Sequence, residues 1–254
     1  MSQRCDALEG RKVHRSDGAA ENQRRWDEKH YQTVNKKPLH WYDITRAHLN
    51  FEVAKGGIIQ KMGTSKPVEE RFKERLEELG VKPNPEVKKN DPAAAKMSNQ
   101  IVEFVFSGDH EVMNMMAFGN QAVDFERDGT ADNSHIQRMN EIEQWATDLY
   151  DWMAKKYGEE NIIGFDVHLD ETTAHCHATI IPVVMRTEKK TGRERPVVSY
   201  KGLFGKDKAT GQEIMKQLHT ELYEQVNSKY GLMRGDLWRF LAHSIRTRFR
   251  CTIS

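Results

Sequence analysis

The chain has 254 residues, of which 30% are charged and 37% hydrophobic, and its formal net charge is +1. A chain of this length can bury a substantial core, either as one large domain or as two small ones. The longest apolar stretch, 178–185, is too short to span a bilayer, and the first residues lack the apolar core of a signal peptide. Three cysteines without metal-ligand spacing favour a reducing compartment. We therefore expect a cytoplasmic protein that makes no membrane contact.

The first hundred residues alternate between strand-like and helix-like patterns. The clearest helix signal in this part is a run of apolar residues at helical spacing, closed by Gly80. The elements predicted here are a strand at 3–13, a helix at 19–29, an exposed loop at 30–43, a strand at 45–53, a short strand at 58–59, a helix at 65–80 and a polar connection at 82–96.

The remaining residues contain a strongly apolar strand, a long amphipathic helix and a histidine-bearing strand pair. Strands separated by long helices predict an α/β (α+β) sandwich, in which a central antiparallel sheet carries helices on one face and leaves the other open. We expect one domain over 1–235 and a basic, unassigned tail at 236–254. The elements predicted here are a strand at 99–106, a short Met-rich helix, a loop at 118–133, a helix at 136–153 capped by Ser134 and Gln137, strands within 162–185, a basic turn at 186–195 and a helix at 214–226.

Three histidines fall on one face of the predicted strand pair. Side chains alternate along a strand, so His175 and His177 share a face while Cys176 points into the core. If the turn 171–174 folds the strands into an antiparallel hairpin, His168 lies about 5 Å from one of them. A single histidine on such a face is usually a satisfied polar residue. Three together predict a metal site.

Three imidazoles form an open ligand set, which leaves positions for water or substrate. The neighbouring carboxylates Asp170 and Glu171 could bind the ion, orient an imidazole through its second nitrogen or accept a proton. An all-imidazole ligand set by itself would suit Zn²⁺ or Ni²⁺ as well as Mn²⁺ or Mg²⁺.

Two basic segments suit a nucleic acid. Arg24 and Arg25 precede Trp26, a combination that fits a phosphate backbone and an unstacked base. The basic turn 186–195 is placed where a hairpin tip would contact DNA. For both segments a solvated surface is an equally good interpretation.

The ten residues from His168 to His177, HLDETTAHCH, resemble the third motif of the Mob/Pre (MobV) plasmid mobilisation relaxases, which are HUH endonucleases. Weaker similarities extend the resemblance to 45–50, where the family has Arg-x-His-Leu-Asn, and to 230–235. The resemblance implies an HUH-type fold and an enzyme that nicks one DNA strand at an origin of transfer. In that reaction the enzyme links covalently to the 5′ phosphate and later reseals the strand, using Mn²⁺ or Mg²⁺.

The resemblance also implies roles for individual residues. It assigns the three histidines to the metal and gives Glu171 a supporting or proton-accepting role. Asn22-Gln23-Arg24-Arg25 takes the place of the family's His-x-x-Arg motif, which makes Arg25 a catalytic candidate. The expected partner is single-stranded or supercoiled DNA at an origin of transfer, with a hairpin, and other mobilisation or coupling proteins are further candidates. The candidate DNA-binding residues are Arg24, Arg46, His48 and Asn50.

Two positions depart from the family pattern. Ala174 replaces the proline that usually precedes the His-x-His pair, which should loosen the turn without removing a ligand. Asn22 stands where the family has its nucleophilic histidine, and an amide nitrogen is not a nucleophile.

The departure at position 22 leaves three functional interpretations open. A displaced nucleophile could act, with Tyr31 or His30 favoured over His40 and Tyr42, or the first motif could align elsewhere and leave His14 as the nucleophile. The protein could instead be a metal-water phosphodiesterase with Glu171 as its base. The third interpretation is a catalytically silent, metal-stabilised DNA-binding module, by nature or because the Asn was introduced to block turnover.

Overall fold

The computed structural model describes residues 4–11, 21–34, 42–85, 97–126 and 131–234. Within these ranges the centre of the protein is a six-stranded sheet in the order β1-β4-β6-β5-β2-β3, and each neighbouring pair is antiparallel. The predicted central antiparallel sheet is therefore confirmed. Its strands are β1 (Arg4–Arg11), β2 (Phe51–Ala54), β3 (Ile58–Lys61), β4 (Ile101–Ser107), β5 (Ile162–His168) and β6 (His175–Ile180).

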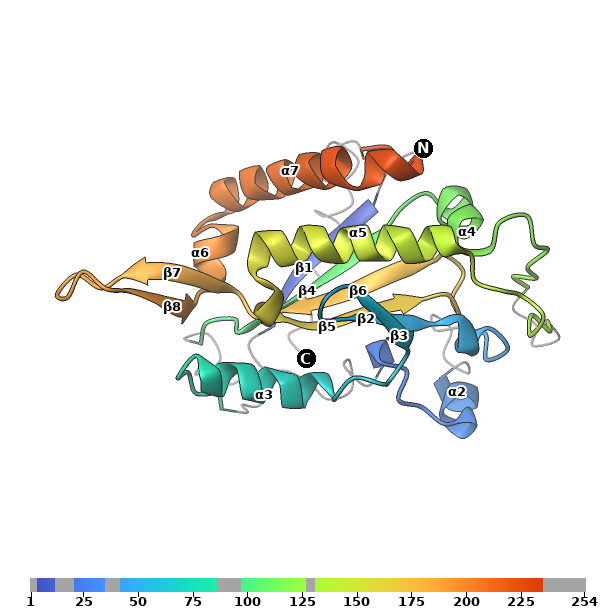
Figure 1. Ribbon diagram of the computed structural model, residues 1–254, viewed down its shortest axis with the longest axis horizontal. Helices are drawn as coiled ribbons and strands as arrows, with labels where there is room; N and C mark the ends of the chain where they lie inside the picture. Colours follow the sequence, from blue (N-terminus) through green and yellow to red (C-terminus); the bar gives the residue numbers. More distant parts are fainter. Residues whose placement is uncertain (1–3, 12–20, 35–41, 86–96, 127–130, 235–254) are drawn as a thin grey trace.

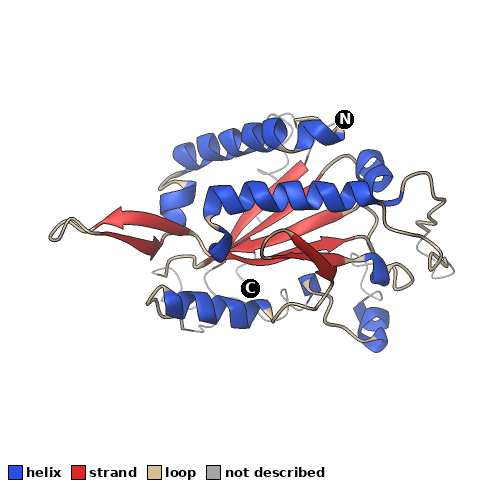
Figure 2. Ribbon diagram, viewed as in Figure 1, coloured by secondary structure: helices blue, strands red, loops and turns tan. Residues whose placement is uncertain are grey.

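One face of the sheet packs against helices, as predicted. Because side chains alternate along a strand, Phe104 of β4 and Phe165 of β5 point to the same side and join one large apolar cluster. The helices α4 (His110–Phe118), α5 (Asn140–Tyr157) and α7 (Lys208–Gln225) supply the other half of this cluster. Figure 1 shows α5 lying along the sheet with α7 beyond it, and Figure 2 shows the resulting layers.

The opposite face carries a helix at one end and polar residues elsewhere. α3 (Val68–Glu78) packs Phe72 and Leu76 against Ile163 and Ile181 on the side away from α5 (Figure 1). The sequence pattern did not predict a helix on this side. The polar residues that share this face are Glu52, Glu103, Asp166, His168, His175, His177 and Thr179.

A second, two-stranded sheet projects from the body of the protein. It consists of β7 (Val183–Thr187) and β8 (Glu194–Val198). Figure 1 shows it extending beyond the central sheet and its helices. The short helix α6 (Tyr200–Phe204) lies at its base and contacts β7. The basic turn predicted at 186–195 is therefore the tip of a free-standing hairpin.

The predicted helix at 19–29 is wrong in its described part. Helical structure ends at Asn22, and Arg24 takes a positive φ of 47°, which a helix cannot continue. A separate helix, α2 (Glu28–Val34), then begins two residues before the predicted loop and continues into it. The physical reason is tertiary, because the bend turns Arg24 inward to pair with Asp170.

Two predicted element starts also differ. β2 begins at Phe51 and not at residue 45, because a 3-10 turn at 47–49 comes first. α5 begins at Asn140, so Ser134 does not cap it. The backbone N–H groups of Gln137 and Met139 donate to Gln121 Oε1 and to the Ala117 carbonyl, and these contacts replace the predicted capping box.

The described part of the chain contains no helix long and apolar enough to cross a membrane. The tail 236–254 and the alternative nucleophiles His14 and His40 lie outside the described residues. The domain boundary at 235 stays a prediction.

Candidate metal centre

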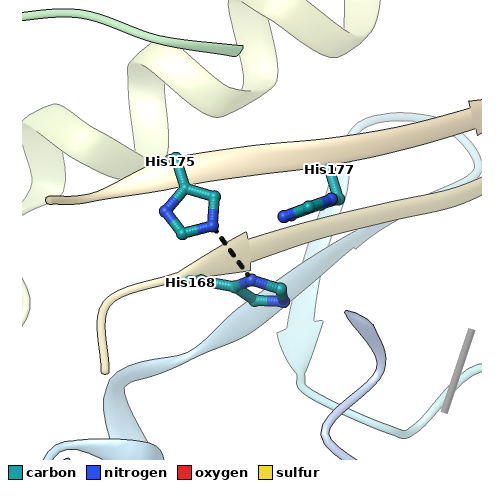
Figure 3. A group of neighbouring side chains, drawn as sticks. All are labelled: His168, His175 and His177. Carbon is teal, nitrogen blue, oxygen red and sulfur yellow. Dashed lines mark hydrogen bonds between the residues drawn. The ribbon is translucent and has the colours of Figure 1, made fainter. Parts of the chain in front are cut away.

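Three histidine side chains converge at one end of the central strand pair. His168 ends β5, while His175 and His177 belong to β6, and the register sets His168 opposite His175 and Asp166 opposite His177. One ring nitrogen from each histidine lies within 4.8 Å of the others. Figure 3 shows the three rings facing a common point between the two strands. The distances suit three ligands of a single ion.

Each imidazole has one nitrogen held by an oxygen acceptor. His168 Nε2 lies 2.6 Å from the Asn22 carbonyl, His175 Nδ1 lies 2.8 Å from the Thr173 carbonyl, and His177 Nδ1 lies 3.2 Å from Glu103 Oε1. Since a carbonyl or an ionised carboxylate only accepts hydrogen bonds, these three nitrogens carry the ring hydrogen. The remaining nitrogen of each ring therefore presents a lone pair.

Two of these lone pairs face each other at short range. His168 Nδ1 and His175 Nε2 are 3.4 Å apart, the pair joined by the dashed line in Figure 3. With their hydrogens on the opposite nitrogens, neither atom can donate to the other. A cation between them would satisfy both. The donor set therefore fits a divalent metal, with the partner oxygens fixing each ring from behind.

The environment also favours the neutral form of His168 and His175. Burial holds the pKa of His168 well below its ordinary value, and the charges of Arg24 and the other two histidines act in the same direction. Burial likewise lowers the pKa of His175, although Glu171 opposes the effect. Metal ions bind the neutral imidazole, so these two ligands need not lose a proton at neutral pH.

Glu171 lies beside the cluster, as expected. Its Oε1 atom is 3.7 Å from His168 Nδ1, 3.6 Å from His175 Nε2 and 2.6 Å from Arg24 Nη2. The same carboxylate oxygen thus lies next to two of the lone pairs and accepts a hydrogen bond from the Arg24 guanidinium. This position allows it to contact a bound ion or a water on that ion.

Asp166 is a second carboxyl on the same face, across the strand pair from His177. It is only 1% exposed, and neither of its oxygens has a hydrogen-bond partner among the described residues. Burial raises the pKa of Asp166 to about 8. At neutral pH the group is largely protonated and adds little negative charge beneath the histidines.

Arg24 is built into the protein interior. Its side chain is 3% exposed, and its Nε and Nη2 atoms each donate to one oxygen of Asp170 at 2.9 Å. The guanidinium also lies over the ring of Tyr42, 4.4 Å from its centroid. These contacts give Arg24 a structural role, in which it holds the turn after β5. The DNA-binding role expected from the sequence stays a prediction for this buried side chain.

Arg46 and Asn50 hold the same turn from another side. Arg46 is fully buried and donates to the carbonyls of Leu169 and Glu171 at 2.6 and 3.1 Å. Asn50 is 2% exposed, and its Oδ1 accepts the N–H of Leu169 at 2.6 Å. Both side chains are buried, and the DNA contact that the sequence suggested for them stays a prediction. Of the predicted DNA-binding residues, only His48 is exposed.

A third support for the turn comes from Asn114 on α4. Its Oδ1 accepts the N–H of Ala174 at 3.1 Å, and its Nδ2 donates to the Thr172 carbonyl at 2.9 Å. A proline at position 174 would have no N–H to offer. The asparagine therefore supplies the restraint that the expected proline would give, and the turn is held although the ring is missing.

We predict that Asn114→Ala weakens Mn²⁺ binding by about 10- to 100-fold, the usual cost of losing a group that positions metal ligands. Adding Ala174→Pro to that variant should recover part of the loss, because the ring fixes φ without needing an acceptor. Alone, Ala174→Pro should weaken binding, since it removes the N–H that Asn114 accepts. Calorimetric titration of the four proteins would measure the coupling. Simply additive losses would contradict this account.

Asn22 and Glu103 form a pair that the sequence interpretation missed in part. Asn22 is 9% exposed, and its Nδ2 donates to Glu103 Oε1 at 2.6 Å, the same oxygen that orients His177. Glu103 was not predicted as a site residue. The available signal was a carboxylate inside an otherwise apolar strand, on the alternation face that leads to the histidines. Position 22 thus contacts the histidine cluster, but through its carbonyl and amide.

The other catalytic candidates differ in their burial and in their contacts. Tyr31 is buried, and its hydroxyl is 3.5 Å from Asp170 Oδ2. Burial, followed by the charge of Asp170, raises the pKa of Tyr31 above its ordinary value. His30 is exposed and stacks on Trp26. Arg25 is exposed and donates to the Ser65 carbonyl at 2.5 Å.

Comparison with known proteins finds one family over most of the chain. A family model described as plasmid recombination enzyme, Mob_Pre, matches residues 87–243. Plasmid recombination enzyme type 1 of Staphylococcus aureus is 31% identical over 96 residues, which are 37% of this chain and 20% of that protein. The match to this curated relative thus spans about a fifth of its length.

Solved structures give the same picture for the fold. The Mn-bound MobM relaxase domain (MOBV; Mob_Pre) on plasmid pMV158 oriT DNA at pH 6.8 is similar with a TM-score of 0.56 and 19% identity, over 93% of this chain and 91% of that one. A second Mn-bound structure of the same MobM relaxase domain on pMV158 oriT DNA, at pH 4.6, is similar with a TM-score of 0.54 and 18% identity. This match covers 93% of this chain and 92% of that one. At this identity the likeness carries the fold alone, and it confirms the predicted fold class.

Proposed function

The chain belongs to the Mob_Pre family of plasmid recombination enzymes, and from that premise we propose that it is a metal-dependent DNA relaxase. It would nick one strand at an origin of transfer, keep the 5′ phosphate in a covalent link and later reseal the strand. Its partner would be single-stranded or supercoiled DNA, with a hairpin at the origin. Other mobilisation or coupling proteins would act with it.

The observation that carries this proposal is the convergence of three imidazole lone pairs, each ring fixed through its second nitrogen. His168, His175 and His177 would hold Mn²⁺ or Mg²⁺. A bound ion of this kind polarises the scissile phosphate and offsets the charge that develops on it. Divalent metal in general is supported by the Mn-bound structures of the MobM relaxase domain.

The chain's own residues would position the reacting groups. Glu103 sets the hydrogen of His177 on Nδ1, and Arg24 keeps the Glu171 carboxylate against the cluster. Glu171 is thereby placed to accept a proton or to bind water at the site. Arg25, the exposed arginine of the first motif, would contact the DNA strand next to the cluster.

The nucleophile we propose is Tyr31, with His30 as the alternative. Tyr31 is supported by its contact to Asp170, the neighbour of Glu171, whereas His30 lies on the exposed side of Trp26. In the first step the tyrosine oxygen would attack phosphorus while its proton passes to a carboxylate. The bond from phosphorus to the 3′ oxygen of the DNA would break, and that oxygen would take up the proton from the carboxylic acid and leave as a hydroxyl. The reverse attack by that hydroxyl would reseal the strand and restore the tyrosine.

A second candidate is a hydrolase in which water replaces the side-chain nucleophile. Asn22 favours it, because this position lies at the histidines and carries no nucleophilic group. Glu171 would then be the base, and the nick would form without any protein–DNA link.

Mass spectrometry separates these candidates. The protein would be incubated with Mn²⁺ and supercoiled DNA from the region flanking its own gene, followed by intact-mass and peptide analysis. The relaxase proposal requires a DNA-linked peptide, which also names the nucleophile, and a Tyr31→Phe variant should lose it. Nicked DNA without an adduct would support the hydrolase. Absence of both would reject enzymatic function in favour of a silent DNA-binding module.

A further inference from the structure

We propose that the β7–β8 hairpin, residues 183–198, binds the backbone of duplex DNA about one helical turn away from the histidines. We call this segment the basic arm. The inference rests on the proposed function only in taking DNA as the polymer that the protein handles. It adds a second contact, which the histidine centre does not provide.

The basic arm is anchored at its base and free at its tip. Val183 and Val198 pack against the apolar cluster beneath α3, and the N–H of Ser199 donates to the Pro182 carbonyl at 2.7 Å. Every residue from 185 to 196 is exposed, on both faces of the ribbon. A two-stranded ribbon in water has no core of its own and is at best marginally stable. A partner that lies against this ribbon would therefore stabilise it.

Charge identifies the class of that partner. Residues 186–195 contain five basic and two acidic side chains. One of the two carboxylates, that of Glu188, accepts a hydrogen bond from the Thr191 hydroxyl at 2.6 Å. The register places Arg186 directly opposite Arg195. Like charges facing each other across a strand pair destabilise it, and a polyanion lying along the ribbon would remove that repulsion. Duplex DNA is a polyanion with one charge per about 1.7 Å of its axis.

Shape and reach favour duplex over single-stranded DNA. The major groove, about 12 Å wide, admits a two-stranded ribbon. The arm projects from the end of the sheet that is opposite to His168 and His175, where β6 ends (Figure 1). Lys189 lies twelve residues after His177, a span of at most about 40 Å of extended chain. DNA held at both places would therefore extend over no more than about 40 Å, a little over one helical turn of about 34 Å.

The test compares two triple variants that remove the same charge. The arm variant is Lys189→Ala/Lys190→Ala/Arg193→Ala, and its matched control takes three exposed lysines from other elements, Lys55→Ala/Lys155→Ala/Lys216→Ala. Fluorescence anisotropy would follow binding to hairpin oligonucleotides with the same single-stranded tail and stems of about 6 or about 20 base pairs, shorter and longer than one turn. Each titration would be repeated over a range of salt concentrations.

On the long stem we expect the arm variant to bind at least about tenfold more weakly. The slope of its plot of log binding constant against log salt concentration should be smaller in magnitude by about 2 to 3, because each lost phosphate contact lowers the slope by roughly 0.9. On the short stem the arm variant, the control and the unmodified protein should bind alike. Unchanged binding of the long stem, as expected if the arm serves an acidic protein instead, would overturn the proposal. Equal losses on both stems would also overturn it. Because binding is measured without nicking, failure of the relaxase proposal would not alter either outcome.

Discussion

Replacing His175 with alanine is expected to abolish metal-dependent nicking while leaving most of the affinity for DNA. The substitution removes one of three lone pairs that converge within 4.8 Å. Changing a group that only positions a metal ligand lowers metal affinity or activity by about 10- to 100-fold. Loss of a ligand itself should therefore lower the nicking rate by about 1,000-fold or more. The backbone contacts proposed for Arg25 and for the basic arm lie outside the cluster and would remain. A plasmid nicking assay and an anisotropy titration, both in Mn²⁺ buffer, would measure the two effects.

The matched control is His135→Ala, which removes an exposed histidine outside the cluster. It should nick at the rate of the unmodified protein. Undiminished nicking by His175→Ala would refute the metal assignment. Calorimetric titration with Mn²⁺ gives an independent measurement, because it detects loss of the ion even if the nicking assay is limited by another step.

Replacing Arg24 with methionine is expected to lower the free energy of unfolding by about 3–5 kcal/mol, the usual cost of stranding a buried charge. Asp170 has no exposed side-chain surface and receives two of its hydrogen bonds from this guanidinium. Methionine fills much of the volume but leaves the carboxylate unpaired. Urea denaturation without added metal would measure the change, so that any loss of metal binding does not contribute.

Two further variants test whether the loss of stability comes from the buried pair of Arg24 and Asp170. Arg24→Lys keeps the charge but not the fork that contacts both Asp170 oxygens, and it should recover only part of the lost stability. Arg25→Met removes the adjacent, exposed arginine and should change stability by less than about 0.5 kcal/mol. Equal effects at positions 24 and 25 would contradict the assignment of Arg24 to the interior.

The strands and the histidine cluster could be predicted because their signals are local. Alternation with period two assigns His168, His175 and His177 to one face, and a short turn between the strands is enough to bring them together. The same alternation assigns Phe104 and Phe165 to the face that α5 covers. No information from distant parts of the chain is needed for either conclusion.

The supports of the site could not be predicted, because they depend on contacts between distant segments. Glu103 on β4 contacts His177, which lies 74 residues later in the chain. Asn114 on α4 contacts Ala174, which lies 60 residues later. Arg24 looked like a surface arginine because composition does not report burial. Its positive φ follows from an ion pair with a residue 146 positions later. The predicted bounds of the helices at 19–29 and 136–153 were wrong for the same reason, because contacts with distant segments set the observed bounds.

The turn between the two histidine strands would make the proposed metal binding a property of the whole fold. All three ligands lie within ten residues, yet the oxygens and amides that hold this segment come from residues 22, 50, 103 and 114. A peptide of residues 162–185 would contain every ligand and lack those supports. Ion affinity therefore reports on complete folding, and a bound ion in turn adds RT ln(1 + [M]/Kd) to the free energy of unfolding. In a cell the chain would gain metal only after synthesis has brought these segments together.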